Sequence, residues 1–268
     1  MRKRLLTIVI VAPILVLLIV QGGLWLRLGL LILSLRGLFE FYRALSKRVL
    51  PVHFISYFFS VLYYLMIIDY ETHALMVTMI SGFVLLTFAM LVVYYQKITL
   101  NDCLTTISGF FYITFLLSFI YLVRVNSVYF VWLIFISASA SDTFAYMIGR
   151  KWGRHKLSGS PSPGKTWEGC IGGVIGAALV GFIYSQIVLY FTGTDHPIVI
   201  NAMAISVMGA VFAQLGDLFA SAVKRSVGIK DFGRILPGHG GVLDRFDSII
   251  VTAPVVYMVI ILMGYFGL

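Results

Sequence analysis

More than half of the acidic residues in this 268-residue chain stand in or beside long apolar segments of its second half. An ionisable group at membrane depth is costly unless it faces a wet cavity or a partner. Their placement therefore predicts a functional site. The residues are Asp142, Glu168, Asp217, Asp231, Asp244 and Asp247.

Asp217 lies inside the apolar segment 198–223 and belongs to a polar stripe. Gln214, Asp217, Ser221 and Lys224 are spaced by three, four and three residues, which puts them on one face of a helix. Such a stripe can also join helices by hydrogen bonds. Because Ser or Asn would do that without a charge, we expect Asp217 to take part in chemistry.

Asp244 and Asp247 are three residues apart at the beginning of the last apolar segment, so their carboxylates project from one helical face. Together with Asp217 from a neighbouring helix they would form the hard, all-oxygen site that Mg²⁺ prefers. Acids in a first helical turn can also simply cap it and offset its dipole. We predict a magnesium site at Asp217, Asp244 and Asp247, and the number of metal ions stays open.

The loop 224–247 is both basic and rich in glycine. Gly238, Gly240 and Gly241 would let backbone N–H groups face an anion, although a tight turn alone would also explain these glycines. The basic composition favours phosphate as that anion. The basic residues are Lys224, Arg225, Lys230, Arg234, His239 and Arg245.

A second basic loop, 150–167, carries hydroxyl groups beside a lysine. Lys165 would supply a point charge for phosphate, and Ser162 and Thr166 would supply hydrogen bonds. Glu168 would orient Lys165 or a metal-bound water. The alternative is a loop whose positive charge only sets membrane topology.

Asp142 shares a helical face with Ser139 and Tyr146, and we expect it to line the site. A structural ion pair with Arg150 is the alternative. Several glycines that follow are expected to allow close helix packing rather than to bind a ligand. They are Gly169, Gly172, Gly173 and Gly176.

The composition assigns these residues to a membrane protein. The chain is 60% hydrophobic and 12% charged, whereas a soluble domain is roughly 25% charged. The net charge of +9 does not indicate a nucleic-acid partner, because no soluble segment is long enough to form a binding module. Basic residues beside apolar segments instead set topology and meet anionic lipid.

Apolar runs between polar breaks predict an all-α, polytopic integral membrane protein with about nine transmembrane helices. Lys and Arg placement puts the N-terminus and both basic loops in the cytoplasm, and the first span is expected to be uncleaved. Residues 1–135 would form a scaffold, and 136–268 a catalytic region. The predicted spans are 5–21, 24–40, 50–68, 73–95, 103–123, 127–149, 168–191, 198–223 and 248–267.

The segment from Ser221 to Asp247 resembles the signature of the phosphatidate cytidylyltransferase family, S-x-x-K-R, then K-D, then P-x-H-G-G-x-x-D-R-x-D. Two upstream elements, S-A-S-D-T-F-A-Y-x-x-G-R and S-P-x-K-T-W-E-G, are also similar, so the resemblance covers about residues 137–250. Family members often have Lys where this chain has Gly164. The signature positions filled here are Ser221, Lys224, Arg225, Lys230, Asp231, Pro237, His239, Gly240, Gly241, Asp244, Arg245 and Asp247.

The resemblance implies attack by a phosphate oxygen of phosphatidic acid on the α-phosphorus of CTP, which gives CDP-diacylglycerol and releases pyrophosphate. It also implies a homodimer in the inner (plasma) membrane, with the site facing the cytoplasm and in contact with membrane lipids. The catalytic residues would be Asp217, Asp244, Asp247, Lys165, Lys224 and Arg225. Substrate would be bound by Ser162, Thr166, Glu168, Ser221, Lys230, Asp231, His239, Gly240, Gly241, Arg245 and Asp142.

Two other functions stay open at this stage. One is a related transferase or kinase that acts on another lipid, such as a CTP-dependent dolichol kinase. The other is a transporter for an anionic solute, since charged residues inside spans also suit ion pathways. Transporters tend to show paired inverted repeats with breaks at the midplane, and no internal repeat is apparent here.

Overall fold

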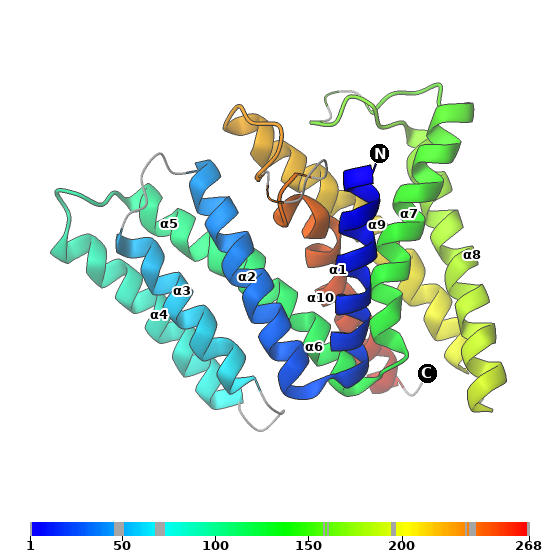
Figure 1. The fold of residues 1–268 in the computed structure, drawn as a ribbon, viewed down its shortest axis with the longest axis horizontal. Helices are drawn as coiled ribbons and strands as arrows, with labels where there is room; N and C mark the ends of the chain where they lie inside the picture. Colours follow the sequence, from blue (N-terminus) through cyan, green and yellow to red (C-terminus); the bar gives the residue numbers. More distant parts are fainter. Residues whose placement is uncertain are drawn as a thin grey trace. The chain divides into compact units, whose positions relative to one another are not determined.

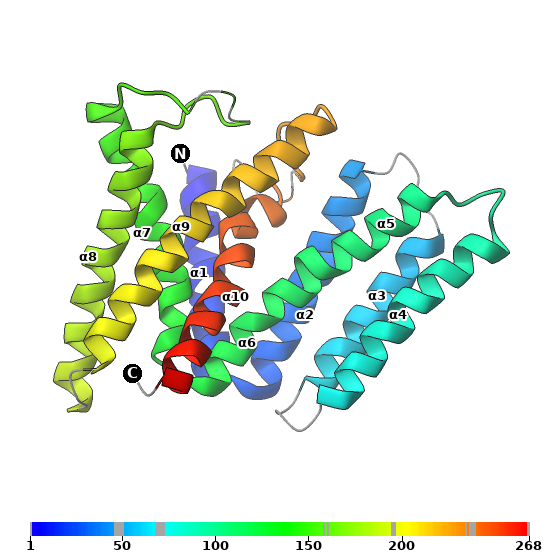
Figure 2. The ribbon, with the colours of Figure 1, turned by 180° about the vertical axis from the view of Figure 1, so that it is seen from behind.

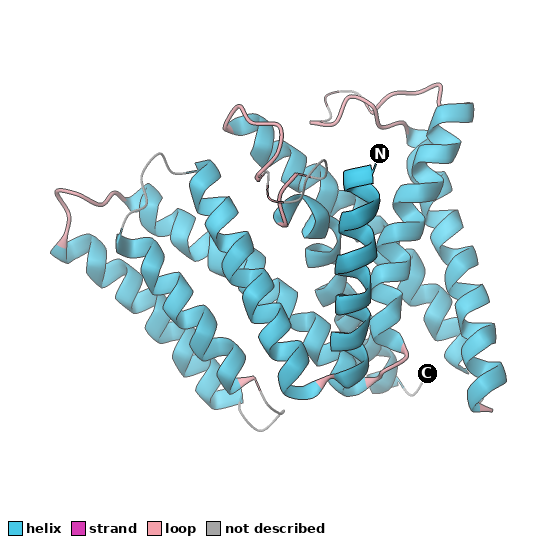
Figure 3. Cartoon of the chain, viewed as in Figure 1, coloured by secondary structure: helices cyan, strands magenta, loops and turns pink. Residues whose placement is uncertain are grey.

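The computed structural model describes residues 2–45, 51–67, 73–157, 159, 161–193, 197–233, 235 and 240–266. Within these ranges the regular elements are helices, and the pairing between Lys156 and Thr166 is an isolated bridge (Figure 3). The predicted all-α class is confirmed. The helices are α1 Arg2–Gln21, α2 Gly23–Leu45, α3 Pro51–Met66, α4 His73–Val93, α5 Leu100–Gly109, the π-helix η2 Phe110–Phe115, α6 Leu116–Asn126, α7 Phe130–Trp152, α8 Trp167–Thr192, α9 Pro197–Ser226 and α10 Leu243–Phe266 (Figure 1).

Length and apolar composition make this a multi-pass membrane protein. In the described part of the chain, 6 helical stretches are long and apolar enough to span a membrane, and α5, η2 and α6 together form one of them, Leu100–Asn126. Two other apolar stretches, Ala12–Gln21 and Val52–Met66, are shorter. Helix α2 carries Arg27, Arg36, Glu40 and Arg43, which reduce its apolar character. The crossing of all nine predicted spans therefore stays a prediction.

The chain divides into two compact units. Unit 1 comprises Met1–Ser118 and Asp231–Arg245, and unit 2 comprises Phe119–Lys230 and Phe246–Leu268. Residues 231–245 of the glycine-rich loop thus belong to the same unit as the first helices of the chain. The proposed division of roles at residue 136 concerns function rather than packing, and it stays a prediction.

In unit 2, α7, α8 and α9 lie side by side (Figures 1 and 2). Glycines on α8 permit the close approach: Gly172 faces the side chain of Ile148, and Gly176 faces the ring of Phe144. A Cβ atom at Gly173 would lie 2.8 Å from the carbonyl oxygen of Ser141. The expected packing role of these glycines is confirmed, and it brings polar groups on the three helices within reach of one another.

In unit 1, buried hydroxyl groups join the helices. The Tyr42 hydroxyl of α2 lies 2.8 Å from Ser56 Oγ of α3 and 2.9 Å from the carbonyl oxygen of Thr106 of α5. Ser60 Oγ and Thr114 Oγ1 are 2.7 Å apart. Such hydrogen bonds hold helices together where lipid provides no hydrophobic drive for association. They fix α2, the helix that contacts the glycine-rich loop.

Candidate active site

A cavity of about 340 Å³ opens in unit 2 among α7, α8, α9 and the loop that joins α7 to α8. Its volume is at the lower end of the range of small-molecule sites. The lining combines an apolar part with convergent charged groups from α7, α9 and the loop. The lining residues are Asp142, Ala145, Tyr146, Gly149, Arg150, Gly164, Lys165, Thr166, Gly169, Cys170, Gln214 and Asp217.

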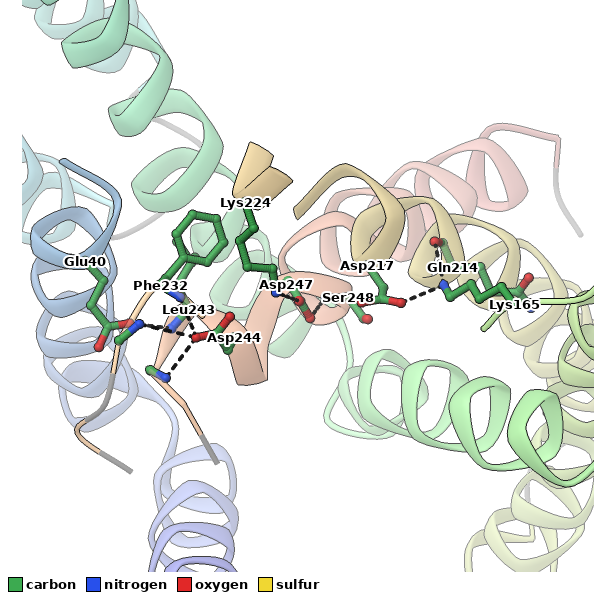
Figure 4. Close-up of polar contacts among 12 residues, drawn as sticks. Glu40, Lys165, Gln214, Asp217, Lys224, Phe232, Leu243, Asp244, Asp247 and Ser248 are labelled. Atoms are coloured by element: carbon green, nitrogen blue, oxygen red, sulfur yellow. Dashed lines mark hydrogen bonds and ion pairs between the residues drawn. The ribbon is translucent and has the colours of Figure 1, made fainter. Parts of the chain in front are cut away.

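Lys165 and Asp217 meet in this cavity. The Lys165 ammonium is 2.6 Å from Asp217 Oδ2 and 3.4 Å from the carbonyl oxygen of Gln214, to which it donates (Figure 4). Both side chains are partly exposed, at 21% and 31%. The structure therefore brings together a predicted phosphate-binding cation and a predicted metal ligand that come from different elements.

Gln214 fixes the three helices around the cavity. Its Nε2 group donates to Ser141 Oγ of α7 at 2.9 Å and to the carbonyl oxygen of Cys170 of α8 at 3.0 Å. Because one α9 side chain satisfies groups on both neighbours, it sets the spacing of the lining. The sequence placed Gln214 on the face of Asp217 but gave it no role in the site.

Backbone contacts give the loop between α7 and α8 a defined shape. Leu157 donates its N–H to the carbonyl oxygen of Lys165 at 3.0 Å, and Trp167 donates to that of His155 at 3.0 Å. Thr166 then caps α8 by accepting the N–H of Gly169 at 3.2 Å. These contacts lie on both sides of Lys165, so its backbone position is held when its side chain meets a ligand.

The contacts of Glu168 differ from the expected ones. Its carboxylate accepts the backbone N–H of His155 and lies 2.6 Å from His155 Nδ1, whereas Lys165 contacts Asp217. The first turn of α8 directs this side chain back toward the loop, so Glu168 fixes the loop instead of orienting Lys165. A direct role of Glu168 in substrate binding stays a prediction. No pattern in the sequence indicated a role for His155.

A third carboxylate in unit 2 is largely buried. Asp247 is 7% exposed, accepts the Ser248 N–H through Oδ1 at 2.8 Å, and has Oδ2 at 4.0 Å from the Lys224 ammonium (Figure 4). The charges of Asp217 and Asp142 act on it and repel its own. Like charges in a poorly solvated place are stabilised either by a compensating cation or by protonation of one of them. Unit 2 thus contains an acidic group suited to binding a cation.

Asp244 lies in unit 1, where it closes the glycine-rich loop. Its Oδ2 atom accepts the N–H groups of Phe232 at 2.8 Å, Gly241 at 2.9 Å and Gly233 at 3.4 Å. Gly240 has φ +83°, a left-handed conformation that favours glycine. The N–H of Gly241, expected to face a phosphate, is directed at this carboxylate. The contacts of Oδ2 agree with the alternative in which Asp244 caps local backbone.

The other predicted residues are distributed as follows. In the described part of the chain, no group of three or more His, Cys, Asp or Glu side chains is gathered as a metal site. Asp217 and Asp247 belong to unit 2 and Asp244 to unit 1, so a shared three-carboxylate site stays a prediction. His239, with Arg234, Pro237 and Gly238, lies outside the described residues.

The model of the cytidylyltransferase family matches residues 2–263. The chain belongs to this family. The match includes residues 2–130, which the sequence motifs left out, and so extends over both units. The family membership suggested by the signature from Ser221 to Asp247 is confirmed.

Named relatives of this family member are bacterial enzymes. It is 31% identical over 270 residues to a phosphatidate cytidylyltransferase of Staphylococcus haemolyticus, a comparison that covers 98% of the chain and 100% of the relative. It is 39% identical over 141 residues to the phosphatidate cytidylyltransferase of Staphylococcus aureus strain COL, covering 53% of the chain and 52% of that protein. The two comparisons are with different relatives, and the shorter one has the higher identity.

The remaining residues of the sequence motifs lie at the end of α9, in the loops and at the beginning of α10. Lys224 and Arg225 are in the last turn of α9, where Arg225 donates to the carbonyl oxygen of Ile229 at 3.3 Å. Ser162 accepts the Lys165 N–H through its carbonyl oxygen at 3.2 Å. Their roles toward substrate stay predictions. Ser221 is half-buried, and the exposed residues are Arg225, Lys230, Asp231 and Arg245.

Proposed function

We propose that the chain transfers the cytidylyl group of CTP to phosphatidic acid, giving CDP-diacylglycerol and pyrophosphate. Family membership over residues 2–263 and the named relatives support this reaction. The structural observation that carries it is the cavity in unit 2 where Lys165 meets Asp217 among membrane helices. A lipid-linked phosphate and a nucleotide are both polyanions, and this cavity offers cations at the ends of apolar helices.

The reaction asks the protein for positioning and charge neutralisation more than for proton transfer. An anionic phosphate oxygen of phosphatidic acid forms a bond to the α-phosphorus of CTP, and the bond from that phosphorus to the pyrophosphate oxygen breaks. The nucleophile is already ionised near neutral pH, so no strong general base is required. Lys165 and Arg150, which both line the cavity, would hold phosphate oxygens and offset the charge that develops on them.

The residues of unit 2 fit a magnesium ion. Mg²⁺ is commonly bound by one or two carboxylates, with substrate phosphates and water completing its shell. Asp217 and Asp247 are two such carboxylates, and a cation beside them would offset the repulsion that Asp247 experiences from Asp217 and Asp142. When bound, the ion would offset the negative charge of the phosphate groups. We propose that Asp217 and Asp247 hold it, with Asp244 as the predicted third ligand.

We further propose that the site faces the cytoplasm of a cell with the enzyme in its inner membrane. The support is the distribution of Lys and Arg, which favours the cytoplasm for the loops after α7 and α9. CTP is available on that side. A homodimer, with membrane lipids around it, is proposed from the family resemblance alone.

The test is the fate of labelled phosphorus. Purified protein in mixed micelles would receive phosphatidic acid and CTP labelled at either the α- or the γ-phosphate, with and without EDTA. Cytidylyl transfer moves the α-label into the chloroform phase and leaves the γ-label in pyrophosphate. A lipid kinase moves the γ-label instead, and a transporter moves neither. The proposal would be contradicted if the γ-label entered the organic phase, or if folded protein put no label into lipid. Transfer that persists in EDTA would exclude a metal ion from the proposed mechanism.

A further inference from the structure

The C-terminal part of α2 holds a buried carboxylate that the proposed chemistry does not use. Glu40 is 0% exposed. A buried charge is strongly destabilising unless it is paired and hydrogen-bonded. The partners of Glu40 therefore indicate what keeps an acid at this position.

Glu40 binds the beginning of α10 within unit 1. Its Oε2 atom accepts the N–H of Leu243, the first residue of α10, at 2.9 Å (Figure 4). Its Oε1 atom is 3.5 Å from Arg36 Nε, one turn earlier on α2. Leu243 is itself 1% exposed, so no water would replace this acceptor for its N–H group.

The same carboxylate is enclosed by two glycines of the loop. A Cβ atom at Gly233 would lie 2.5 Å from Glu40 Oε1, and a Cβ atom at Gly241 would contact Glu40 Oε2 more closely still. Both positions are thus glycine because the Glu40 carboxylate occupies the space of a side chain. One turn further along α2, Arg43 Nη2 donates to the carbonyl oxygen of Phe232 at 3.1 Å.

Two carboxylates consequently hold this loop. The carboxylate of Asp244, on α10, accepts the N–H groups of Phe232, Gly233 and Gly241. The carboxylate of Glu40, on α2, accepts the N–H group of Leu243, the residue before Asp244. The backbone that positions Asp244 therefore depends on a side chain supplied by the N-terminal helices.

We propose that Glu40 is a positioning residue for the reaction, acting through its contact with the Leu243 N–H to set the glycine-rich loop and the first turn of α10. The inference rests on the proposed function for its kinetic consequence. It gives the N-terminal helices a specific part in holding the glycine-rich loop beyond that of a membrane scaffold. The contact, and not only the negative charge, is what the loop requires.

Two conservative variants separate contact from charge. Glu40→Gln keeps the side-chain length and a carbonyl oxygen that can accept the Leu243 N–H, but loses the charge. Glu40→Asp keeps the charge but is one methylene too short to reach. The matched control is Ser34→Ala. Ser34 is a buried residue of α2, like Glu40, and its hydroxyl lies 3.0 Å from the Tyr64 hydroxyl of α3, away from the loop.

The measurements are amide hydrogen exchange over residues 231–246, and kcat and KM for CTP. We expect Glu40→Asp to raise exchange at Leu243 and to lower kcat/KM by about tenfold, the effect of one lost hydrogen bond to a charged group. Glu40→Gln should retain most of the exchange protection of Leu243 and most of kcat/KM. Ser34→Ala should change neither the exchange at Leu243 nor kcat/KM.

Greater activity and protection in the Asp variant than in the Gln variant would overturn the proposal, as would equal losses in Ser34→Ala. An unchanged Leu243 exchange rate in both Glu40 variants would also overturn it. Failure of the proposed function would give a different result. The wild type would show no cytidylyl transfer, while Leu243 would still exchange faster in Glu40→Asp than in Glu40→Gln.

Discussion

The ion pair between Lys165 and Asp217 is better suited to chemistry than to stability. Both side chains are partly open to solvent, and an ion pair of this kind contributes about 1 kcal/mol or less to folding. Because its members line a cavity, either charge can exchange its partner for a ligand of opposite charge. Substitutions here should therefore change catalysis far more than the free energy of unfolding.

Lys165→Ala tests the cation. We expect kcat/KM for CTP to fall by about a hundredfold or more, since a positioned charge on a transferring phosphate is lost, while the melting temperature stays within a few degrees of the wild type. Steady-state kinetics and thermal unfolding check this. Lys156→Ala, in the same loop and exposed, is the matched control and should be nearly normal. Equal losses in both variants would mean that only the charge of the loop matters.

The sequence predicted Lys165 and Asp217 as site residues because an acid at membrane depth and a lysine among hydroxyl groups carry a local signal. It could not predict that they contact each other, because they come from different elements. Glu40 was missed although the cost of a buried acid applies equally to it. The signal was an acid in an apolar segment one turn after Arg36, in a span considered only as scaffold.

At the scale of elements, glycines on α8 set how closely the walls of the cavity approach. Gly173 faces the Ser141 carbonyl oxygen and Gln214 Nε2, and a Cβ atom would lie 2.8 Å from each. The periodicity of small residues predicted close packing. It could not predict that Gln214 makes hydrogen bonds to Ser141 and to the Cys170 carbonyl oxygen at the place where these helices meet.

Gly173→Ala should destabilise the protein by about 1–3 kcal/mol, the usual effect of overpacking a tight contact, and should reduce cytidylyl transfer because Gln214 is displaced. Thermal unfolding in detergent and the transfer assay measure the two effects. The control is Gly82→Ala in α4, where nothing lies within 4 Å of the added Cβ atom. That variant should be neutral or more stable by up to about 1 kcal/mol. Wild-type stability and activity in Gly173→Ala would show that the helices can move apart freely.

At the scale of the whole molecule, composition alone predicted the membrane class, because 12% charged residues cannot cover a water-soluble surface of this size. The number of crossings was harder to predict. Helix α2 carries four charged residues. One of them, Glu40, is buried and accepts a hydrogen bond from the Leu243 N–H group. Hydropathy treats such charges as interruptions of a span, although they have partners inside the protein.

The proposed topology makes a prediction for cysteine labelling. Lys156→Cys, in the loop after α7, should react with a membrane-impermeant maleimide only in inside-out vesicles, because positive charge keeps that loop in the cytoplasm. Val125→Cys, exposed at the end of α6, should react only from the outer side of intact spheroplasts. The unsubstituted chain controls for Cys103 and Cys170. Labelling of both positions from one side would contradict the predicted orientation.

The central claim is that the cavity among α7, α8 and α9 is where cytidylyl transfer takes place. The most direct measurement compares Asp217→Asn with Asp102→Asn for transfer of α-labelled CTP to phosphatidic acid. Asp102 caps α5 by a contact with Thr99 and has no part in the proposed site. We predict that Asp217→Asn lowers kcat by at least about a hundredfold in a folded protein, whereas Asp102→Asn stays within about threefold of the wild type. Near-normal transfer by folded Asp217→Asn would contradict the claim and remove this cavity from the reaction.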